Sequence, residues 1–89
     1  MRRNRIFERH FLDAALQRDP KNLPALEQLL ALDIQELRQS DAERHAQEIL
    51  QIQPRHAQAN YILGSINSAK ENYPMAEAFL RVSLSSRTN

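Results

Sequence analysis

Hydrophobic residues recur along this 89-residue chain at the three- and four-residue spacing of amphipathic helices, and no stretch alternates like a β-strand. Four prolines divide the chain into segments of helical length. Together these features predict five helices, at residues 5–18, 23–37, 40–53, 57–71 and 73–86. Because the links between them have only a few residues, successive helices are expected to pack antiparallel.

Apolar residues at helical spacing mark a face on each predicted helix. They are Phe7, Phe11, Ala14 and Ala15; Leu26, Leu29, Leu30 and Leu37; Ala42, Ala46, Ile49 and Leu50; Ala59, Ile62, Leu63 and Ile66; and Ala76, Phe79 and Leu80. In the second helix the apolar residues run consecutively from 29 to 32, so its apolar surface is wider than one stripe. We expect this helix to be covered from more than one side.

Local signals mark two helix starts. The segment from Ser40 to Glu43 fits the S-x-x-E capping box, in which both side chains satisfy unpaired backbone donors. Asn72 is placed to cap the last helix, with Pro74 in the first turn.

Gly64 is the only glycine, and it falls inside the fourth predicted helix. A glycine there costs about 1 kcal/mol relative to alanine. We therefore expect another helix to approach very closely at Gly64. The alternative is a tolerated helix glycine with no packing role.

Composition indicates one small folded domain. Hydrophobic residues make up 42% and charged residues 26%, which is typical of soluble globular chains. The chain has no cysteine, so disulfides and thiolate metal sites are excluded, while a cytoplasmic or a periplasmic location both stay open. No apolar run approaches the roughly 18 residues of a membrane-spanning helix, and we expect neither a membrane span nor a signal peptide.

Charge is unevenly distributed, at +3 over residues 1–22, −3 over 23–56 and +1 over 57–89. The cluster of Arg2, Arg3, Arg5 and Arg9 raises the possibility of phosphate binding. Base-stacking aromatic residues are not interleaved with these arginines, so a solvated helix start is the preferred interpretation.

The sequence resembles itself when it is shifted by about 34 residues. We call this shift the repeat length. Residues shared at this offset include Leu16, Leu50 and Leu84; Pro20 and Pro54; Ala25 and Ala59; Leu29 and Leu63; Ala42 and Ala76; and Glu43 and Glu77. Apolar residues fall on the faces expected to pack, and proline falls at the break between hairpins. The sequence therefore predicts a repeated helical hairpin.

This repeat length and these residues resemble the tetratricopeptide repeat (TPR) family. Leu63 and Gly64 match its Leu-Gly pair, Tyr73 its aromatic at the intra-repeat turn, and Pro54 its closing proline. Ala76 and Leu80 match its Ala-x3-aromatic pair in spacing. Departures are Leu30 at the glycine position, Asp33 and Asn67 at an aromatic position, and Leu26 and Asn60 at the tryptophan position.

The resemblance implies an all-α, right-handed, TPR-like solenoid of about five antiparallel helices. Residues 1–22 would hold the second helix of a truncated upstream repeat and a turn, 23–56 a degenerate repeat, and 57–89 a further repeat. It also implies that Ala76 supplies the gap facing Gly64. With about two and a half units, the chain is interpreted as part of a longer array.

The resemblance further implies a protein-binding scaffold whose first helices line a concave groove. The groove residues carried over in this way are Glu27, Gln28, Ala31, Ile34, Gln35, Tyr61, Ile62, Ser65, Ser68 and Ala69. Tyr61 is the best anchor candidate, because tyrosine is enriched at binding hot spots. Glu27 is acidic and the other positions carry no cation, so capture of an acidic chaperone tail is not expected.

No catalytic constellation is present. His10, His45 and His56 lack metal-ligand spacing, and His45 is interpreted as a helix-surface residue and His56 as a loop residue. The chain has neither a phosphate-binding glycine loop nor a G-x-S-x-G elbow. We expect no enzyme activity, metal, cofactor or small-molecule substrate.

Two other functions stay open. One is an RNA-binding helical repeat, although the helix faces show no regularly repeated base-reading pair, so nucleic acid is not the expected partner. The other is a purely structural or oligomerisation segment, since uncapped ends of the solenoid could associate with another copy. The identity of a protein or peptide partner does not follow from the residues.

Overall fold

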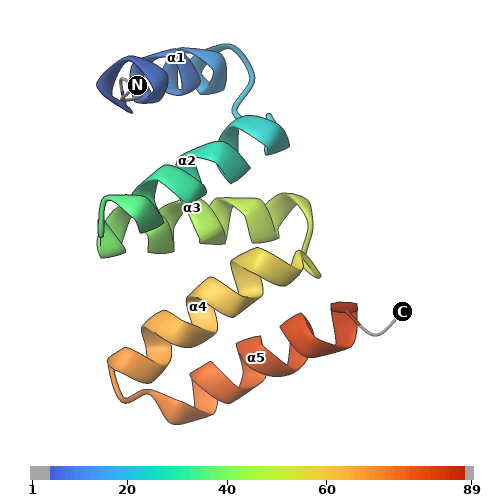
Figure 1. The fold of residues 1–89 in the computed structure, drawn as a ribbon. Helices are drawn as coiled ribbons and strands as arrows, with labels where there is room; N and C mark the ends of the chain where they lie inside the picture. Colours follow the sequence, from blue (N-terminus) through green and yellow to red (C-terminus); the bar gives the residue numbers. More distant parts are fainter. Residues whose placement is uncertain (1–4, 88–89) are drawn as a thin grey trace.

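The computed structural model describes residues 5–87 and folds them into five α-helices, with no strand in that range. The helices are α1 (Arg5–Arg18), α2 (Leu23–Gln35), α3 (Gln39–Ile52), α4 (Ala57–Ala69) and α5 (Tyr73–Arg87). They are stacked in chain order, with α1 and α5 at opposite ends (Figure 1). Across residues 5–87, only helices adjacent in sequence bring Cα atoms within 8 Å of each other. The predicted all-α arrangement of helical hairpins is confirmed, and the stack is open.

Helix boundaries recur at the repeat length that the sequence shows. α3 begins and ends one repeat length after α1, α4 does the same relative to α2, and α5 begins one repeat length after α3. The starts of α2 and α4 are also built alike. Asn22 and His56 precede them, and each side chain accepts a hydrogen bond of 3.1 Å from the backbone N–H three residues further on.

Both hairpin turns close in the same way. Leu37 after α2 and Glu71 after α4 adopt the left-handed backbone conformation, with φ of 57° and 61°. In the first turn the Arg38 N–H donates to the Asp33 carbonyl oxygen at 2.8 Å, and the equivalent bond after α4 has the same length. This is the Schellman arrangement, which satisfies carbonyl groups at a helix end. It ends α2 and α4 two residues before the predicted ends at 37 and 71.

Two hydrophobic clusters hold the stack together. The larger joins α2, α3 and α4 through Leu26, Leu30, Ala42, Ala46, Ile49, Ala59, Leu63 and Ile66. The smaller joins α1 to α2 through Leu12, Ala25, Leu29 and Leu32. Because α2 contributes leucines to both clusters, it is covered on two sides, as its wide apolar surface predicts. Burial of each large side chain stabilises the fold by about 1.5–3 kcal/mol.

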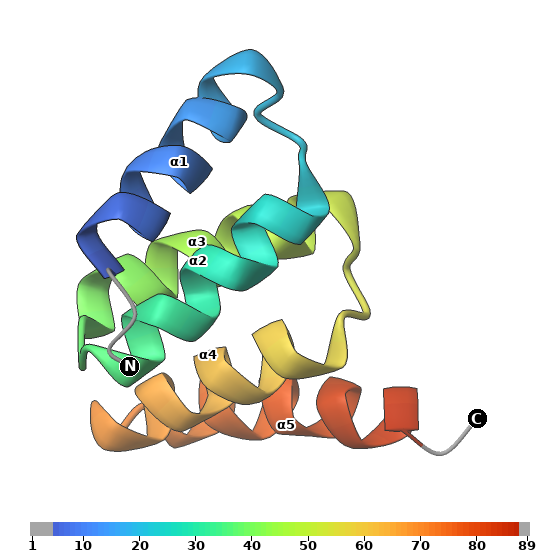
Figure 2. The same cartoon turned by 45° about the horizontal axis from the view of Figure 1, so that its top comes forward.

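α4 and α5 lie side by side along their length (Figure 2), and they approach closely at Gly64. A Cβ atom on Gly64 would lie 2.7 Å from Leu80 Cγ and 3.3 Å from the carbonyl oxygen of Ala76. Ordinary contacts between these atoms are longer, so a side chain here requires the Leu80 side chain or α5 to shift. The predicted close approach at Gly64 is confirmed.

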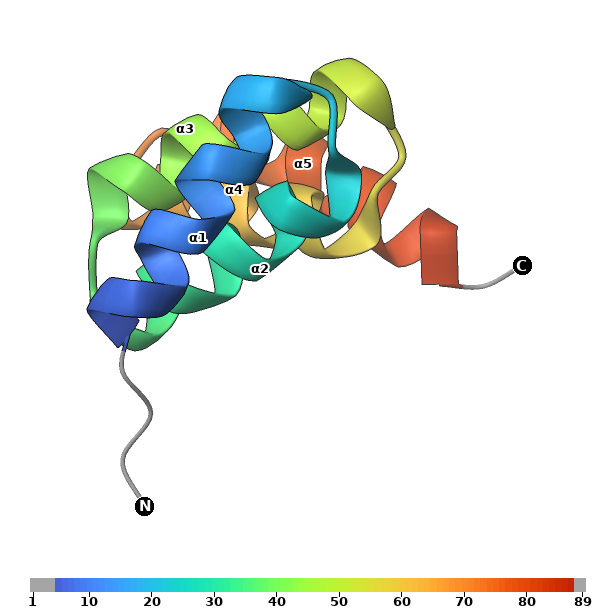
Figure 3. The same ribbon diagram turned by 90° about the horizontal axis from the view of Figure 1, so that it is seen from above.

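Helical spacing groups Phe7 and Phe11 with the packed apolar residues, but the structure leaves both largely exposed. α1 forms the top of the stack (Figure 3) and packs downward through Leu12 and Leu16. At the other end Leu84 is also exposed, although the repeat places it on a packing face. In residues 5–87 no helix precedes α1 or follows α5 to cover these side chains.

The predicted capping box at Ser40 is wrong. α3 begins at Gln39, and the residue before it, Arg38, makes no side-chain capping bond. The left-handed residue at position 37 turns the chain so tightly that the next helix begins one residue before Ser40. At the start of α5 the prediction agrees with the structure to the extent that the helix begins at Tyr73, directly after Asn72.

Candidate functional site

A pocket of about 250 Å³ lies between the C-terminal halves of α2 and α4, next to the turn that leads into α3. Its lining is mainly apolar, with polar groups beside it. The lining residues are Asp33, Ile34, Leu37, Arg38, Gln39, Ala42, Ile62, Ser65 and Ile66. The end of α2, the turn after it, the start of α3 and part of α4 therefore form one mainly apolar site.

Three of the ten predicted groove residues line this pocket, namely Ile34, Ile62 and Ser65. The other seven are exposed or half-buried on α2 and α4: Glu27, Gln28, Ala31, Gln35, Tyr61, Ser68 and Ala69. Their role as a binding surface stays a prediction. Sequence reasoning missed Leu37, because it placed this residue on the helix and not in the turn.

Glu27 has a structural partner within the chain. Its Oε2 lies 2.6 Å from Nε2 of His56, while Nδ1 of the same ring accepts the capping hydrogen bond from Ala59 N–H. His56 thus lies in the turn, as predicted, and also joins the first turn of α4 to α2. Glu27, one of the predicted groove residues, therefore helps to hold α2 and α4 together.

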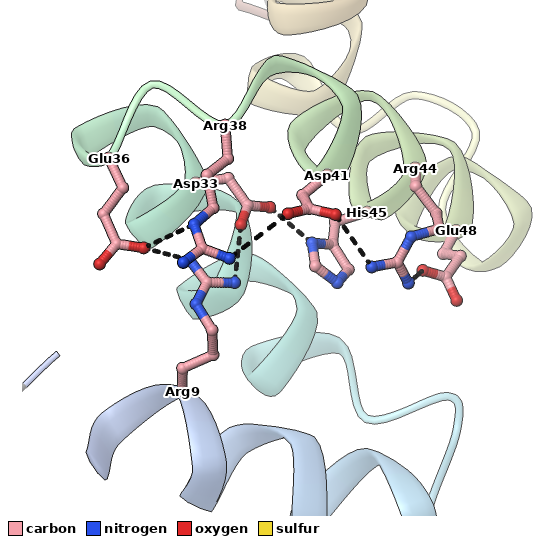
Figure 4. Close-up of polar contacts among 8 residues, drawn as sticks. All are labelled: Arg9, Asp33, Glu36, Arg38, Asp41, Arg44, His45 and Glu48. Atoms are coloured by element: carbon pink, nitrogen blue, oxygen red, sulfur yellow. Dashed lines mark hydrogen bonds and ion pairs between the residues drawn. The ribbon is translucent and has the colours of Figure 1, made fainter. Parts of the chain in front are cut away.

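A second polar cluster joins α1, α2 and α3 (Figure 4). At its centre is Asp33, whose side chain is completely buried. Its Oδ1 accepts a hydrogen bond of 2.9 Å from Arg9 Nη1 of α1, and its Oδ2 lies 2.5 Å from His45 Nδ1 of α3. His45 is only 3% exposed, so its assignment to the helix surface is wrong. The buried carboxylate requires partners, and His45 supplies one of them.

The cluster extends outward through half-buried Glu36 and then through more exposed charges. Glu36 accepts a hydrogen bond of 2.7 Å from Arg9 and lies 3.3 Å from Arg38. Beyond it, Asp41 lies 3.7 Å from Arg38 and 3.4 Å from Arg44. The pairs of Asp41 are well exposed to solvent, so they contribute little stability, about 0–1 kcal/mol each. The buried contacts of Asp33 therefore join both α1 and α3 to α2.

In this cluster the pKa values of Glu36 and Arg9 differ from the ordinary values of these side chains. The hydrogen bond from Arg9 lowers the pKa of Glu36, partial burial opposes the change, and the positive charges of Arg9, Arg38 and Arg5 add to it. Burial acts to lower the pKa of Arg9, but hydrogen bonds to Glu36 and Asp33 and their negative charges raise it overall. Arg9 therefore keeps its charge at every physiological pH.

Acid is expected to weaken the contact between α1 and α2. The folded-state pKa of Glu36 lies below its ordinary value of about 4.3, so its contribution to stability is present above that pH. The contribution is lost as the pH falls through the lower folded-state value. Urea unfolding between pH 6 and pH 3 should show a weaker pH dependence for Glu36→Gln than for the parent. An unchanged pH dependence in that variant would contradict this assignment.

The contacts of Asp33 hold neighbouring helices together. Both carboxylate oxygens are occupied by side-chain partners from neighbouring helices. The ion pair from Arg9 to Glu36 recurs one repeat length later, with the charges exchanged, between Glu43 and Lys70 at 3.0 Å. In residues 5–87 no group of three or more acidic or histidine side chains is arranged to hold a metal ion.

The structure thus places the chain in a class of fold: an all-α stack of helical hairpins, with an apolar pocket between α2 and α4. The chain matches no protein-family model, and neither the curated proteins nor the solved structures contain a match. None of the helices in residues 5–87 is long and apolar enough to cross a membrane.

Proposed function

We propose that this protein is a non-catalytic, TPR-like scaffold that binds a peptide or protein segment in the groove between α2 and α4. The observation that carries this proposal is the apolar pocket formed where the two hairpins meet. Three of the ten groove residues implied by the tetratricopeptide resemblance line this pocket. Tyr61, which is 52% exposed on α4, adds a large side chain suited to contact with a partner.

Leu37 supports the proposal because its placement is unfavourable for the isolated chain. It is 90% exposed, and its left-handed backbone conformation costs roughly 1–2 kcal/mol for residues other than glycine. The equivalent turn position after α4 is occupied by polar Glu71, so the turn itself does not require leucine. A large apolar side chain beside an apolar pocket is explained by contact with a partner.

The size of the pocket indicates what enters it. Small-molecule sites usually measure about 300–1,000 Å³, and this pocket is smaller, at about 250 Å³. It therefore suits one bulky apolar side chain of a longer segment. Nearby Arg38, Gln39 and Ser65 provide groups that hydrogen-bond to the backbone of that segment.

Binding of selected peptides should depend on Leu37 and Ile62. Peptides are selected from a displayed random library on the immobilised protein, and their affinities are measured by fluorescence anisotropy. We expect Leu37→Asn, which suits the left-handed turn, and Ile62→Asp at the pocket each to weaken binding at least about tenfold, a change of about 1.4 kcal/mol. Leu84→Asn is the matched control, because this exposed leucine lies on α5.

Three outcomes would argue against the groove. Selection could give no peptide, the peptides could bind both variants as tightly as the parent, or Leu84→Asn could weaken binding equally. RNA binding with a steep dependence on salt, measured by filter binding, would favour the nucleic-acid alternative. Self-association through the exposed ends of the stack is a further part of the proposal, and sedimentation over a range of concentrations measures it.

A further inference from the structure

α1 carries a second apolar surface, distinct from the pocket between α2 and α4. Ile6 and Phe7 are exposed near its start, and Phe11 is 68% exposed at its centre. Phe7, Phe11, Ala14 and Arg18 follow one another at intervals of three or four residues, so they lie on one side of the helix. Arg18, also exposed, forms the end of this stripe.

α3 and α5 occupy the same position in the repeat as α1, and they show what normally covers this side of the helix. The residues one and two repeat lengths after Phe11 are His45 and Phe79. His45 is buried and contacts Asp33 of α2, which is the helix before α3. Phe79 packs on the cluster that includes residues of α4, the helix before α5. In both hairpins this position therefore faces the preceding helix.

The opposite side of α1, and likewise of α3, faces the helix that follows it in the chain. Arg9 of α1 contacts Glu36 of α2, and the equivalent Glu43 of α3 contacts Lys70 of α4. The side of α1 that faces α2 therefore makes its expected contacts. The opposite side, which in α3 and α5 faces the preceding helix, is the exposed stripe of α1. The pair Phe11-Leu12 recurs as Phe79-Leu80, in which Leu80 packs against α4 at Gly64.

We propose that the exposed stripe of α1 is a docking site for an amphipathic helix, supplied by a partner segment, that lies antiparallel to α1 as α4 lies against α5. Its apolar side covers Phe11, and it carries a small residue where α4 has Gly64. Its first turn lies beside the C-terminal end of α1, where Arg18 attracts acidic residues. Acidic residues in that turn are also favoured by the helix dipole.

The docking surface is already ordered before the partner binds. Arg9 fixes α1 to α2 by hydrogen bonds of 2.9 Å to Asp33 and 2.7 Å to Glu36, and Leu12 is buried beneath it. Binding therefore does not have to order α1, and the partner helix alone loses conformational freedom. This proposal is independent of the groove, because the stripe and the pocket share no residue.

A tethered copy of α4 tests the docking surface directly. Residues 55–72 are copied, with Gln58→Glu in the copy, and joined to Arg5 in place of residues 1–4, which reproduces the register of the repeat. The tether gives an effective concentration of about millimolar, so weak docking is detected. We expect the thermal midpoint to rise by roughly 4 °C or more relative to the same extension carrying Leu63→Pro in the copy.

The rise should disappear with Phe11→Glu and decrease with Arg18→Glu, whereas Leu84→Glu on α5 should leave it unchanged. In the chain without the extension, Phe11→Glu should shift the midpoint little, because Phe11 is largely exposed. No rise, or a rise that persists with Phe11→Glu, overturns the proposal. A rise that depends instead on Leu37 places the added helix in the groove, which overturns this proposal and leaves the proposed function intact.

Discussion

Replacing Asp33 with alanine is expected to lower the free energy of unfolding by about 3 kcal/mol. Removing one member of a buried charge pair typically costs about 3–5 kcal/mol, because the remaining group is left buried without a partner. The lower end applies here, since Arg9 keeps its hydrogen bond to Glu36. His45, which is 3% exposed, loses its partner on Nδ1. Urea unfolding followed by circular dichroism measures the change.

Asp41→Ala is the matched control for this effect. Asp41 is also an aspartate paired with arginines, but its side chain is 38% exposed. Its loss should therefore cost less than about 1 kcal/mol. A triple variant with Arg9→Met, Asp33→Leu and His45→Leu should recover most of the stability, because apolar residues of similar volume often replace buried ion pairs without loss. Equal effects of Asp33→Ala and Asp41→Ala would show that the burial of Asp33 does not matter.

Gly64→Leu is expected to destabilise the chain by about 1–3 kcal/mol, although leucine is the better helix former. The first added atom would already lie 2.7 Å from Leu80 Cγ, and the rest of the side chain has to displace α5. Ser68→Leu, at an exposed position of α4, is the control and should change stability little. Thermal melts of both variants decide the matter, and a Gly64→Leu protein as stable as the parent would refute close packing.

A double-mutant cycle separates crowding from helix propensity at Gly64. Gly64→Ala improves helix propensity by about 1 kcal/mol but places a methyl group against Leu80. In a Leu80→Ala background that obstacle is removed, so Gly64→Ala should be more favourable there than in the parent. Additive effects of the two substitutions would show that Leu80 is not the obstacle.

Several elements were predictable because their cause is local. Proline at positions 20, 54 and 74 and the apolar spacing place five helices within two residues of their structural boundaries. Gly64 was predictable as a point of close approach, because a helix glycine is costly unless something requires it. In the candidate site, Ile34, Ile62 and Ser65 were found because the register of the repeat places them on equivalent helices.

Other features depend on partners far along the chain. The burial of His45 follows from Asp33, twelve residues earlier, and the burial of Asp33 depends on Arg9, a further 24 residues before it. A clear signal was nevertheless present, because an aspartate in the apolar run from 29 to 34 needs a buried partner. The mistaken capping box at Ser40 has a similar origin, since the left-handed turn at Leu37 is not recognisable from its residue type.

The amino-acid sequence by itself determined the secondary structure, the repeat length and the close contact at Gly64, because spacing, proline and glycine act through the local backbone. The tertiary structure alone decided which apolar residues are covered. Phe11 and Leu84 occupy positions that pack in the other hairpins, and both are exposed because the neighbouring helix is missing at each end of the described stack. Burial is a property of the neighbours that a side chain meets, and spacing along one helix does not specify them.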